Sequence, residues 1–270
     1  MERLDKAVAT FGNIPRSEAV KRIRRGEVTV DGTVCRDPAG KWDPAAHTIA
    51  LAGRVLDSRL HCYFMLNKPR GILCVSRDPK APTVVDLLPA DWRRRGIFPA
   101  GRLDKDTVGL VLLTDDGDYA HRLLSPEKAV FKRYLALVEG VMPPAAVAAF
   151  AAGTTLSDGT PCLPAKLSIL KEAAFLQAAL PKSPTMTAFL EKYTIPPVDS
   201  YSFVEIAIQE GRYHQIKRMC ESVDHKVLWL KRLSIGGLEL DADLEEGQCR
   251  ELSAAEVASV FEKVEVVCAT

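Results

Sequence analysis

Residues 101–117 read Gly-Arg-Leu-Asp-Lys-Asp-Thr-Val-Gly-Leu-Val-Leu-Leu-Thr-Asp-Asp-Gly, a charged loop followed by an apolar run. The run Leu110–Leu113 predicts a buried strand, which a turn at Asp116-Gly117 closes. Asp104 precedes this strand and follows Arg102, so a carboxylate and a cation share a loop at the mouth of a sheet. Rigid scaffolds commonly present catalytic groups on such loops. Asp104 is therefore the first candidate for a functional residue.

Two other interpretations fit the same loop. Aspartates beside glycines are often turn formers on a solvated loop that has no chemical role. The stretch 104–108 also fits the Asp-x-Asp nucleophile loop of haloacid-dehalogenase-like phosphotransferases. In those enzymes the apolar strand comes before the first Asp, whereas here residues 98–103 make a poor strand and the apolar strand follows. The order of the elements argues against a phosphotransferase.

The composition indicates a globular protein of two domains. The chain has 270 residues, of which 47% are hydrophobic and 26% charged. It contains no apolar stretch near the roughly 20 residues of a membrane span and no apolar signal-peptide core. Seven cysteines without a Cys-x-x-Cys pattern indicate reduced thiols and no zinc spacing. We therefore expect a cytoplasmic protein with no membrane partner.

Positive charge is concentrated at the N-terminus, although the whole chain has a net charge of only +1. Residues 1–26 contain seven cations and three anions, a local balance of +4. Ser17 is expected to cap a helix to about Arg25, with apolar residues on one face and cations on the other. A hairpin that turns at Asp31-Gly32 is predicted next. Such a module suits the phosphates of structured RNA, so the candidate RNA contacts are Arg3, Lys6, Arg16, Lys21, Arg22, Arg24 and Arg25.

Three polar or aromatic residues accompany other predicted elements. Lys68 follows a predicted strand that ends at a Pro-x-Gly turn, and it is either a phosphate ligand or an ordinary surface lysine. Tyr134 lies on a predicted strand over 131–140, as a core residue or as an aromatic face for an extruded base. Lys217 lies on a helix predicted from Tyr213 to about residue 223.

These motifs together resemble those of the rRNA pseudouridine synthase family. Gly-Arg-Leu-Asp-x-Asp-Thr-x-Gly-Leu is present at 101–110, Asn-Lys-Pro-x-Gly at 67–71, and Gly-Arg-x-His-Gln-Ile-Lys-Arg-Met at 211–219. Residues 1–50 resemble the S4 RNA-binding domain, with mild departures at Pro15 and Asp31. The stretch 231–240 extends the resemblance to the branch that acts on the small ribosomal subunit.

The resemblance implies an α+β fold in two parts. An S4 RNA-binding module would occupy residues 1–57. A catalytic domain over 61–270 would contain a mixed, mostly antiparallel sheet flanked by helices. Residues 173–200 are richer in proline than the family pattern requires, so we expect a surface insertion with two short helices. The Ser253–Glu256 capping box predicts one further helix, which would reach Val264.

The implied reaction is the isomerisation of uridine to pseudouridine in rRNA, without a cofactor or a metal ion. Asp104 would be the catalytic residue, Tyr134 would pack on the uracil, and Lys217 would pair with Asp104. Arg102 would fill the space that the flipped base leaves or bind the neighbouring phosphate. His214 would have a structural role. Whether Asp104 attacks the sugar or only assists glycosidic cleavage stays open.

The expected partner is 16S rRNA or a small-subunit assembly intermediate, with uridine 516 as the target and the protein acting as a monomer. Two alternatives remain. The chain could act on large-subunit rRNA, or it could be an RNA-binding assembly factor without turnover. Retention of Asp104, Tyr134 and Lys217 together argues against the second.

Overall fold

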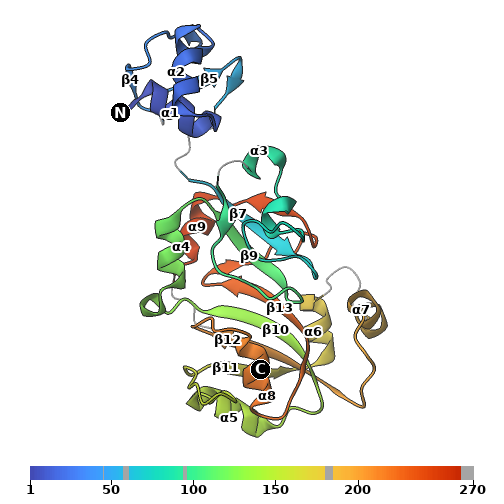
Figure 1. Ribbon diagram of the computed structural model, residues 1–270. Coiled ribbons are helices and arrows are strands. Elements are labelled where there is room, and N and C mark those ends of the chain that lie inside the picture. The colour runs from blue at the N-terminus through green and yellow to red at the C-terminus, as the bar shows by residue number, and fades with distance from the viewer. Residues whose placement is uncertain (45, 57–60, 94–95, 180–184, 263–270) are drawn as a thin grey trace. The chain divides into compact units, whose positions relative to one another are not determined.

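The computed structural model describes residues 1–44, 46–56, 61–93, 96–179 and 185–262 (Figure 1). The chain divides into two compact units. The first comprises Met1–Cys62 with Arg94–Gly96, and the second comprises Tyr63–Arg93 with Ile97–Thr270. Each unit has its own buried core.

The first unit packs two helices on a small antiparallel sheet. The sheet has the strand order β3-β2-β5-β6, and a separate pair joins β1 to β4. Leu4, Ile23 and Ile49 are almost completely buried between the helices and the sheet. The elements are α1 (Leu4–Gly12), α2 (Arg16–Arg24), β1 (Glu2–Arg3), β2 (Val28–Val30), β3 (Thr33–Val34), β4 (Lys41–Trp42), β5 (Ile49–Leu51) and β6 (Arg54–Val55).

The predicted hairpin is confirmed, but the predicted helix cap is wrong. Asp31 and Gly32 both have positive φ, as a two-residue hairpin turn requires, and they join β2 to β3. Helix α2 begins one residue before Ser17, and Pro15 occupies the cap position without a side-chain hydrogen bond. The fixed φ of proline suits a helix start, so Ser17 falls inside the first turn.

The second unit contains a nine-stranded sheet in the described part of the chain. Its main order is β11-β12-β10-β13-β9-β7-β15, with β8 and β14 as short additions beside β9 and β13. All pairs are antiparallel except β13 with β9, so the predicted mixed, mostly antiparallel sheet is confirmed. The strands are β7 (Tyr63–Lys68), β8 (Phe98–Pro99), β9 (Val108–Thr114), β10 (Lys132–Glu139), β11 (Lys166–Leu170), β12 (Tyr201–Ile208), β13 (Val227–Ile235), β14 (Leu238–Glu239) and β15 (Cys249–Glu251).

Gly109 allows the single parallel pair to form. It has a φ of +98°, and a Cβ atom there would lie 2.4 Å from the backbone oxygen of Arg232. Only glycine tolerates both the left-handed conformation and this close approach. The glycine in the 101–110 motif therefore brings the strand that follows Asp104 directly beside β13.

Helices cover both faces of this sheet (Figure 1). Asp116 caps α4 through a hydrogen bond from the backbone N–H of Tyr119, so the expected turn at 116–117 is a helix start. The predicted capping box of Ser253 and Glu256 is present at α9, while Val264 lies outside the described residues. The helices are α3 (Ala90–Arg93), α4 (Gly117–Leu124), α5 (Pro144–Ala152), α6 (Glu172–Ala179), α7 (Met186–Tyr193), α8 (Gln215–Glu221) and α9 (Ala254–Ser259), with short 3₁₀ turns at Val84–Leu87 and Pro126–Lys128.

The segment 173–200 is more than a surface insertion. Both expected helices form, as α6 and α7, although residues 180–184 lie outside the described residues. Phe175 and Phe189 are fully buried, and each packs edge-on against Trp229 of β13. Two buried aromatic side chains contribute roughly 3–6 kcal/mol of hydrophobic stabilisation. The segment therefore completes the core on one face of the sheet.

Candidate active site

The loop that carries Asp104 is tied to the turn after β7. The Lys68 ammonium group donates hydrogen bonds to the carbonyls of Pro69, Lys105 and Thr107, at 3.2, 3.2 and 2.8 Å. The backbone N–H of Gly71 donates to the Lys105 carbonyl as well. The motifs at 67–71 and 101–110 thus form one hydrogen-bonded unit, and it fixes the position of Asp104.

Both sequence-based interpretations of Lys68 are therefore wrong. Its side chain is 0% exposed, so it neither binds a phosphate nor lies on the surface. Burial lowers the pKa of Lys68 to about 8, against the opposing influence of nearby Cys74, Asp106 and Asp104. The lysine is a positioning residue that satisfies backbone carbonyls of the loop that lies beside the end of β7.

We expect Lys68→Met to lower activity about 10- to 100-fold and to reduce the free energy of unfolding by about 2–3 kcal/mol. The reason is that the backbone carbonyls which accept hydrogen bonds from the Lys68 ammonium group would lose their donor. Unfolded lysine keeps its proton to about pH 10.4, so between pH 8 and 10 the wild type should gain stability relative to the variant. Denaturant titration at both pH values measures this.

Lys231→Met is the matched control for that prediction. Lys231 is also a buried lysine with a pKa lowered by burial to about 8, and it donates to the carbonyls of Ala178 and Ala179. Its loss should destabilise the fold while leaving turnover within about threefold. Equal loss of activity in the two variants would show that Lys68 acts through general stability alone.

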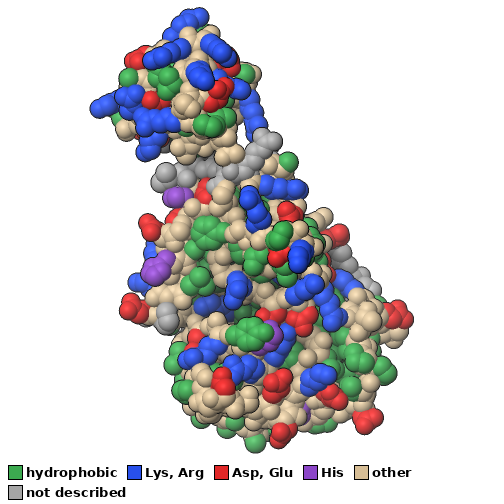
Figure 2. Space-filling model, viewed as in Figure 1, with side chains coloured by type: hydrophobic (Ala, Val, Ile, Leu, Met, Phe, Trp, Pro, Cys, Tyr) green, Lys and Arg blue, Asp and Glu red, His purple; other side chains and the backbone are tan. Residues whose placement is uncertain are grey.

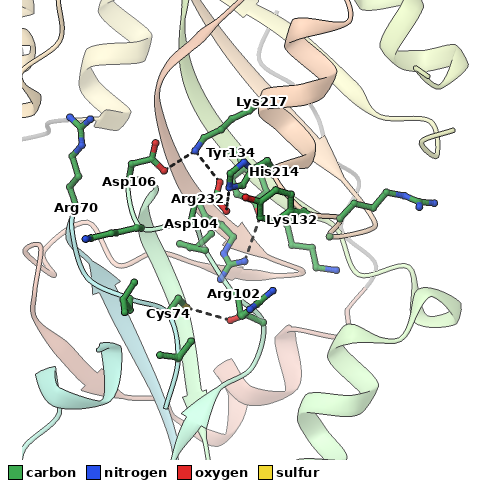
Figure 3. A pocket seen from close by; sticks show the side chains of 18 of the residues that line it. Arg70, Cys74, Arg102, Asp104, Asp106, Lys132, Tyr134, His214, Lys217 and Arg232 are labelled. Carbon is green, nitrogen blue, oxygen red and sulfur yellow. Dashed lines mark hydrogen bonds and ion pairs between the residues drawn. The ribbon is translucent and has the colours of Figure 1, made fainter. Parts of the chain in front are cut away.

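Lys217 extends from the first turn of α8 toward two carboxylates (Figure 3). Its Nζ lies 3.0 Å from Asp104 Oδ2 and 2.7 Å from Asp106 Oδ1. The pair with Asp104 is the contact that the resemblance implied, and Asp106 is an additional partner. Lys217 is 19% exposed and Asp104 is 26% exposed, so water only partly screens the pair.

The charges in this trio reinforce one another. Burial alone would lower the pKa of Lys217, but hydrogen bonds and charge from Asp106 and Asp104 outweigh it and raise the pKa above its ordinary value. Burial likewise opposes ionisation of Asp106, yet Lys217 lowers its pKa. Lys217 therefore stays charged at neutral pH, and its contribution to stability is lost only as pH rises through the raised pKa.

The start of α8 is held by its own motif. The Gln215 side chain donates to Glu210 at 2.8 Å and accepts from the Arg212 backbone N–H at 2.9 Å. His214 adopts the left-handed conformation just before the helix. Its Nε2 lies 3.5 Å from Asp104 Oδ1. His214 thus faces the carboxylate as well as shaping the backbone.

Tyr134 forms part of the floor of the site. It lies on β10 directly opposite Arg232 of β13, and the Arg232 guanidinium donates to the tyrosine hydroxyl at 3.5 Å. Arg232 is 3% exposed and also donates to the Leu110 carbonyl. Lys132 lies two residues before Tyr134, and burial together with Arg232 lowers its pKa to about 8. Tyr134 is thus set among cationic donors.

These groups line one cavity of about 930 Å³. Asp104, Tyr134, Lys217 and Arg102 all border it, which brings together the four residues that sequence reasoning placed at the catalytic centre. Further cations at its edge are Arg70, Lys105 and Arg212. Figure 2 shows Lys and Arg side chains grouped on the second unit. The cavity is large enough for a nucleotide and suits a polyanion.

Sequence reasoning missed Asp106, Lys132 and Arg232. Asp106 is within the quoted motif, so its closeness to Asp104 was the available signal. Arg232 and Lys132 reach the cavity through alternation on paired strands, and that requires the register of β10 against β13.

The N-terminal cations belong to the first unit, whereas the residues that line the cavity belong to the second. Arg3 and Arg16 both bind the buried carboxylate of Asp5 and, with burial opposing them, lower its pKa to about 2. Arg22 pairs with Glu18 at 3.1 Å, so a glutamate of α2 itself compensates one of the cations on this face. Two other candidate cations have acidic neighbours: Lys6 pairs with Glu2, and Arg25 lies 4.0 Å from Glu27. The remaining two, Lys21 and Arg24, are exposed.

The described residues offer neither a metal-binding cluster nor a membrane-spanning helix. No group of three or more His, Cys, Asp or Glu side chains there is arranged to hold a metal ion. No helix in the same residues is long and apolar enough to cross a membrane.

Chemically, the site offers a half-buried carboxylate beside a lysine, a tyrosine hydroxyl and an excess of cations at the rim. A carboxylate held in this way acts as a nucleophile or as an electrostatic stabiliser of a developing cation. Asp104 lies in the loop before β9 (Val108–Thr114). In the phosphotransferase alternative, the nucleophilic Asp would instead follow its strand.

The chain is similar to known proteins over most of its length. The ribosomal small subunit pseudouridine synthase A of Escherichia coli is 40% identical over 262 residues, covering 96% of this chain and 99% of the relative. An RNA pseudouridine synthase of Bacillus subtilis is 35% identical over 94% of this chain and 96% of its own length. A crystal structure of a pseudouridylate synthase, 34% identical, covers 96% of this chain and 100% of its own, with a TM-score of 0.60.

Two protein-family models match separate parts of the chain. The S4 domain matches residues 2–41, within the first unit. The RNA pseudouridylate synthase description matches residues 62–222, more than half of the chain, and that range includes Asp104, Tyr134 and Lys217. The chain therefore belongs to the RNA pseudouridylate synthase family and carries an S4 domain before its catalytic unit.

Proposed function

We propose that this enzyme converts one uridine of small-subunit rRNA, uridine 516 of 16S rRNA, to pseudouridine. The observation that carries the proposal is the contact of Lys217 with Asp104 inside a cation-rimmed cavity that also contains Tyr134. The small-subunit target is supported by the 40% identity to the relative named ribosomal small subunit pseudouridine synthase A. The protein would act in the cytoplasm as a monomer, on 16S rRNA or an assembly intermediate.

The reaction breaks the bond between C1′ of the ribose and N1 of uracil, rotates the base, and forms a bond from C1′ to C5. The proton on C5 is lost and N1 gains a proton, so the change is an isomerisation. Asp104 either attacks the sugar or stabilises the charge that develops when the glycosidic bond breaks. Tyr134 packs on the flipped uracil.

The catalytic residues are assigned from the same geometry. Asp104 is the essential group, and Lys217, 3.0 Å away, keeps it oriented. Arg102 lies at the cavity edge, where it occupies the space of the flipped base or binds the next phosphate.

Release of tritium from 16S rRNA labelled at C5 of uridine tests the proposal. The wild-type protein should release one tritium per RNA in excess EDTA, provided that the RNA folds without divalent ions. Release from 23S rRNA instead would indicate the large-subunit alternative. Binding of 16S rRNA without any release would indicate an assembly factor.

We further propose that the first unit supplies much of the RNA affinity. Lys21, Arg24 and Arg25 are exposed on α2 and the residue after it. Their combined replacement by Ala should weaken binding, because each lost phosphate contact reduces the slope of log K against log salt by roughly 0.7–0.9. A fall of about two in this slope is expected, if at least two of them touch phosphate.

Three exposed lysines of the second unit provide a charge-matched control for this experiment: Lys128, Lys171 and Lys226. Replacing these with Ala removes the same charge and should leave the slope within half a unit. Filter binding between 50 and 300 mM salt compares the two variants. Identical slopes would show that α2 presents only a solvated face.

A further inference from the structure

Tyr213 stands out at the rim of the active-site cavity. Its side chain is 72% exposed, and among the described residues it is the one aromatic among the exposed large hydrophobic side chains. It borders the same cavity as Asp104. Aromatic rings usually gain stability by burial, so an exposed ring at a binding cavity calls for a partner.

A strained backbone conformation at the next residue fixes the position of the Tyr213 ring. His214 has a φ of 49°, a left-handed conformation that costs a residue with a side chain free energy. Successive side chains on a strand point to opposite faces, but here the rings of Tyr213 and His214 stack with centroids 3.8 Å apart and planes 18° from parallel. Helix α8 and the Gln215 hydrogen bonds fix both ends of the turn. Tyr213 is therefore a preformed platform.

The surroundings identify the class of partner. Arg70, Arg102, Lys105 and Arg212 border the same cavity, so a ligand above Tyr213 meets several cations. A flat π system attached to phosphates satisfies both the ring and the charges, and a nucleobase of RNA has this chemistry. On the basis of the proposed function, we infer that Tyr213 stacks on a base of the substrate RNA.

That base is a neighbour of the target uridine. One face of Tyr213 is covered by His214, and it is His214 that contacts Asp104 at 3.5 Å. The open face of Tyr213 is turned away from His214. A base stacked on that face is therefore separated from the Asp104 carboxylate by the rings of Tyr213 and His214. The target uracil belongs beside Asp104 and Tyr134. Tyr213 therefore holds a flanking nucleotide while the target is displaced from the stack.

A double-substitution cycle tests this inference. The probe is a 16S rRNA fragment containing uridine 516, with each flanking nucleotide in turn made abasic. Stacking predicts that Tyr213→Ala weakens binding about 5- to 100-fold and that Tyr213→Phe stays within twofold. At one flanking position, base removal should weaken the wild type by a similar factor and the Ala variant by less than twofold.

Salt dependence and turnover separate stacking from other roles. Tyr213→Ala should keep the wild-type salt slope, because no phosphate contact is lost. Val141→Ala, at a side chain 74% exposed and absent from the cavity lining, is the control and should bind normally. Reduced kcat with unchanged affinity would instead indicate that Tyr213 merely supports His214.

Fluorescence anisotropy of the 16S rRNA fragment measures binding without turnover. Failure of the proposed function can therefore be distinguished from failure of this inference. A wild-type protein that binds no 16S fragment contradicts the proposed function and this inference with it. Binding that is indifferent to Tyr213→Ala, or equal losses at every abasic position in both proteins, overturns the inference alone.

Discussion

Asp104→Asn should reduce the rate of pseudouridine formation at least about a thousandfold while RNA affinity stays within a few-fold. Asparagine keeps the shape of the side chain and a hydrogen bond to Lys217, which lies 3.0 Å away, but it has no charge. The exposed cations of the first unit and the cations that line the cavity are unaltered. Single-turnover tritium release under saturating RNA measures the loss of the chemical step.

Asp106→Asn is the control for this experiment. Asp106 also pairs with Lys217, but its side chain is 53% exposed. Its neutralisation should lower the rate less than about tenfold, since Lys217 still pairs with Asp104. Substantial turnover by Asp104→Asn, or equal losses in the two variants, would contradict the assignment of Asp104 as the catalytic residue.

Lys217→Met should lower kcat about 30- to 150-fold, the equivalent of about 2–3 kcal/mol. It removes the cation from two carboxylates at once and leaves Asp104 and Asp106 as neighbouring like charges. Because the pair is partly exposed, the effect falls at the lower end of the range for buried pairs. Steady-state kinetics on the same labelled RNA provides the measurement.

Lys217→Arg keeps the charge and should retain turnover within about tenfold of the wild type. Failure of Arg to rescue, with unchanged folding, would mean that the lysine ammonium acts by more than charge and position. Wild-type rates in Lys217→Met would refute the role of the ion pair.

The resemblance to the rRNA pseudouridine synthase family placed Asp104, Tyr134 and Lys217 in one site, and all three border the same cavity. Each belongs to a short motif at the end of an element or on one strand, and the periodicity of those elements is clear. The sheet follows from the same apolar runs, because β7, β9 and β10 are almost wholly buried.

Other features depend on tertiary contacts that no local pattern reveals. A lysine before a Pro-x-Gly turn looks like a surface residue, and only the packing of the Asp104 loop against the end of β7 buries Lys68. Arg232 faces the site because β13 shifts register against β10 between Arg133 and Tyr134. Proline content suggested an exposed segment around α6 and α7, whereas packing on Trp229 makes it part of the core.

Mapping of pseudouridine in rRNA, in cells with and without this protein, tests the central claim most directly. We predict that pseudouridine at uridine 516 of 16S rRNA disappears without the protein, returns with the wild type, and stays absent with Asp104→Asn. Persistence of that modification without the protein, or its restoration by Asp104→Asn, would contradict the account.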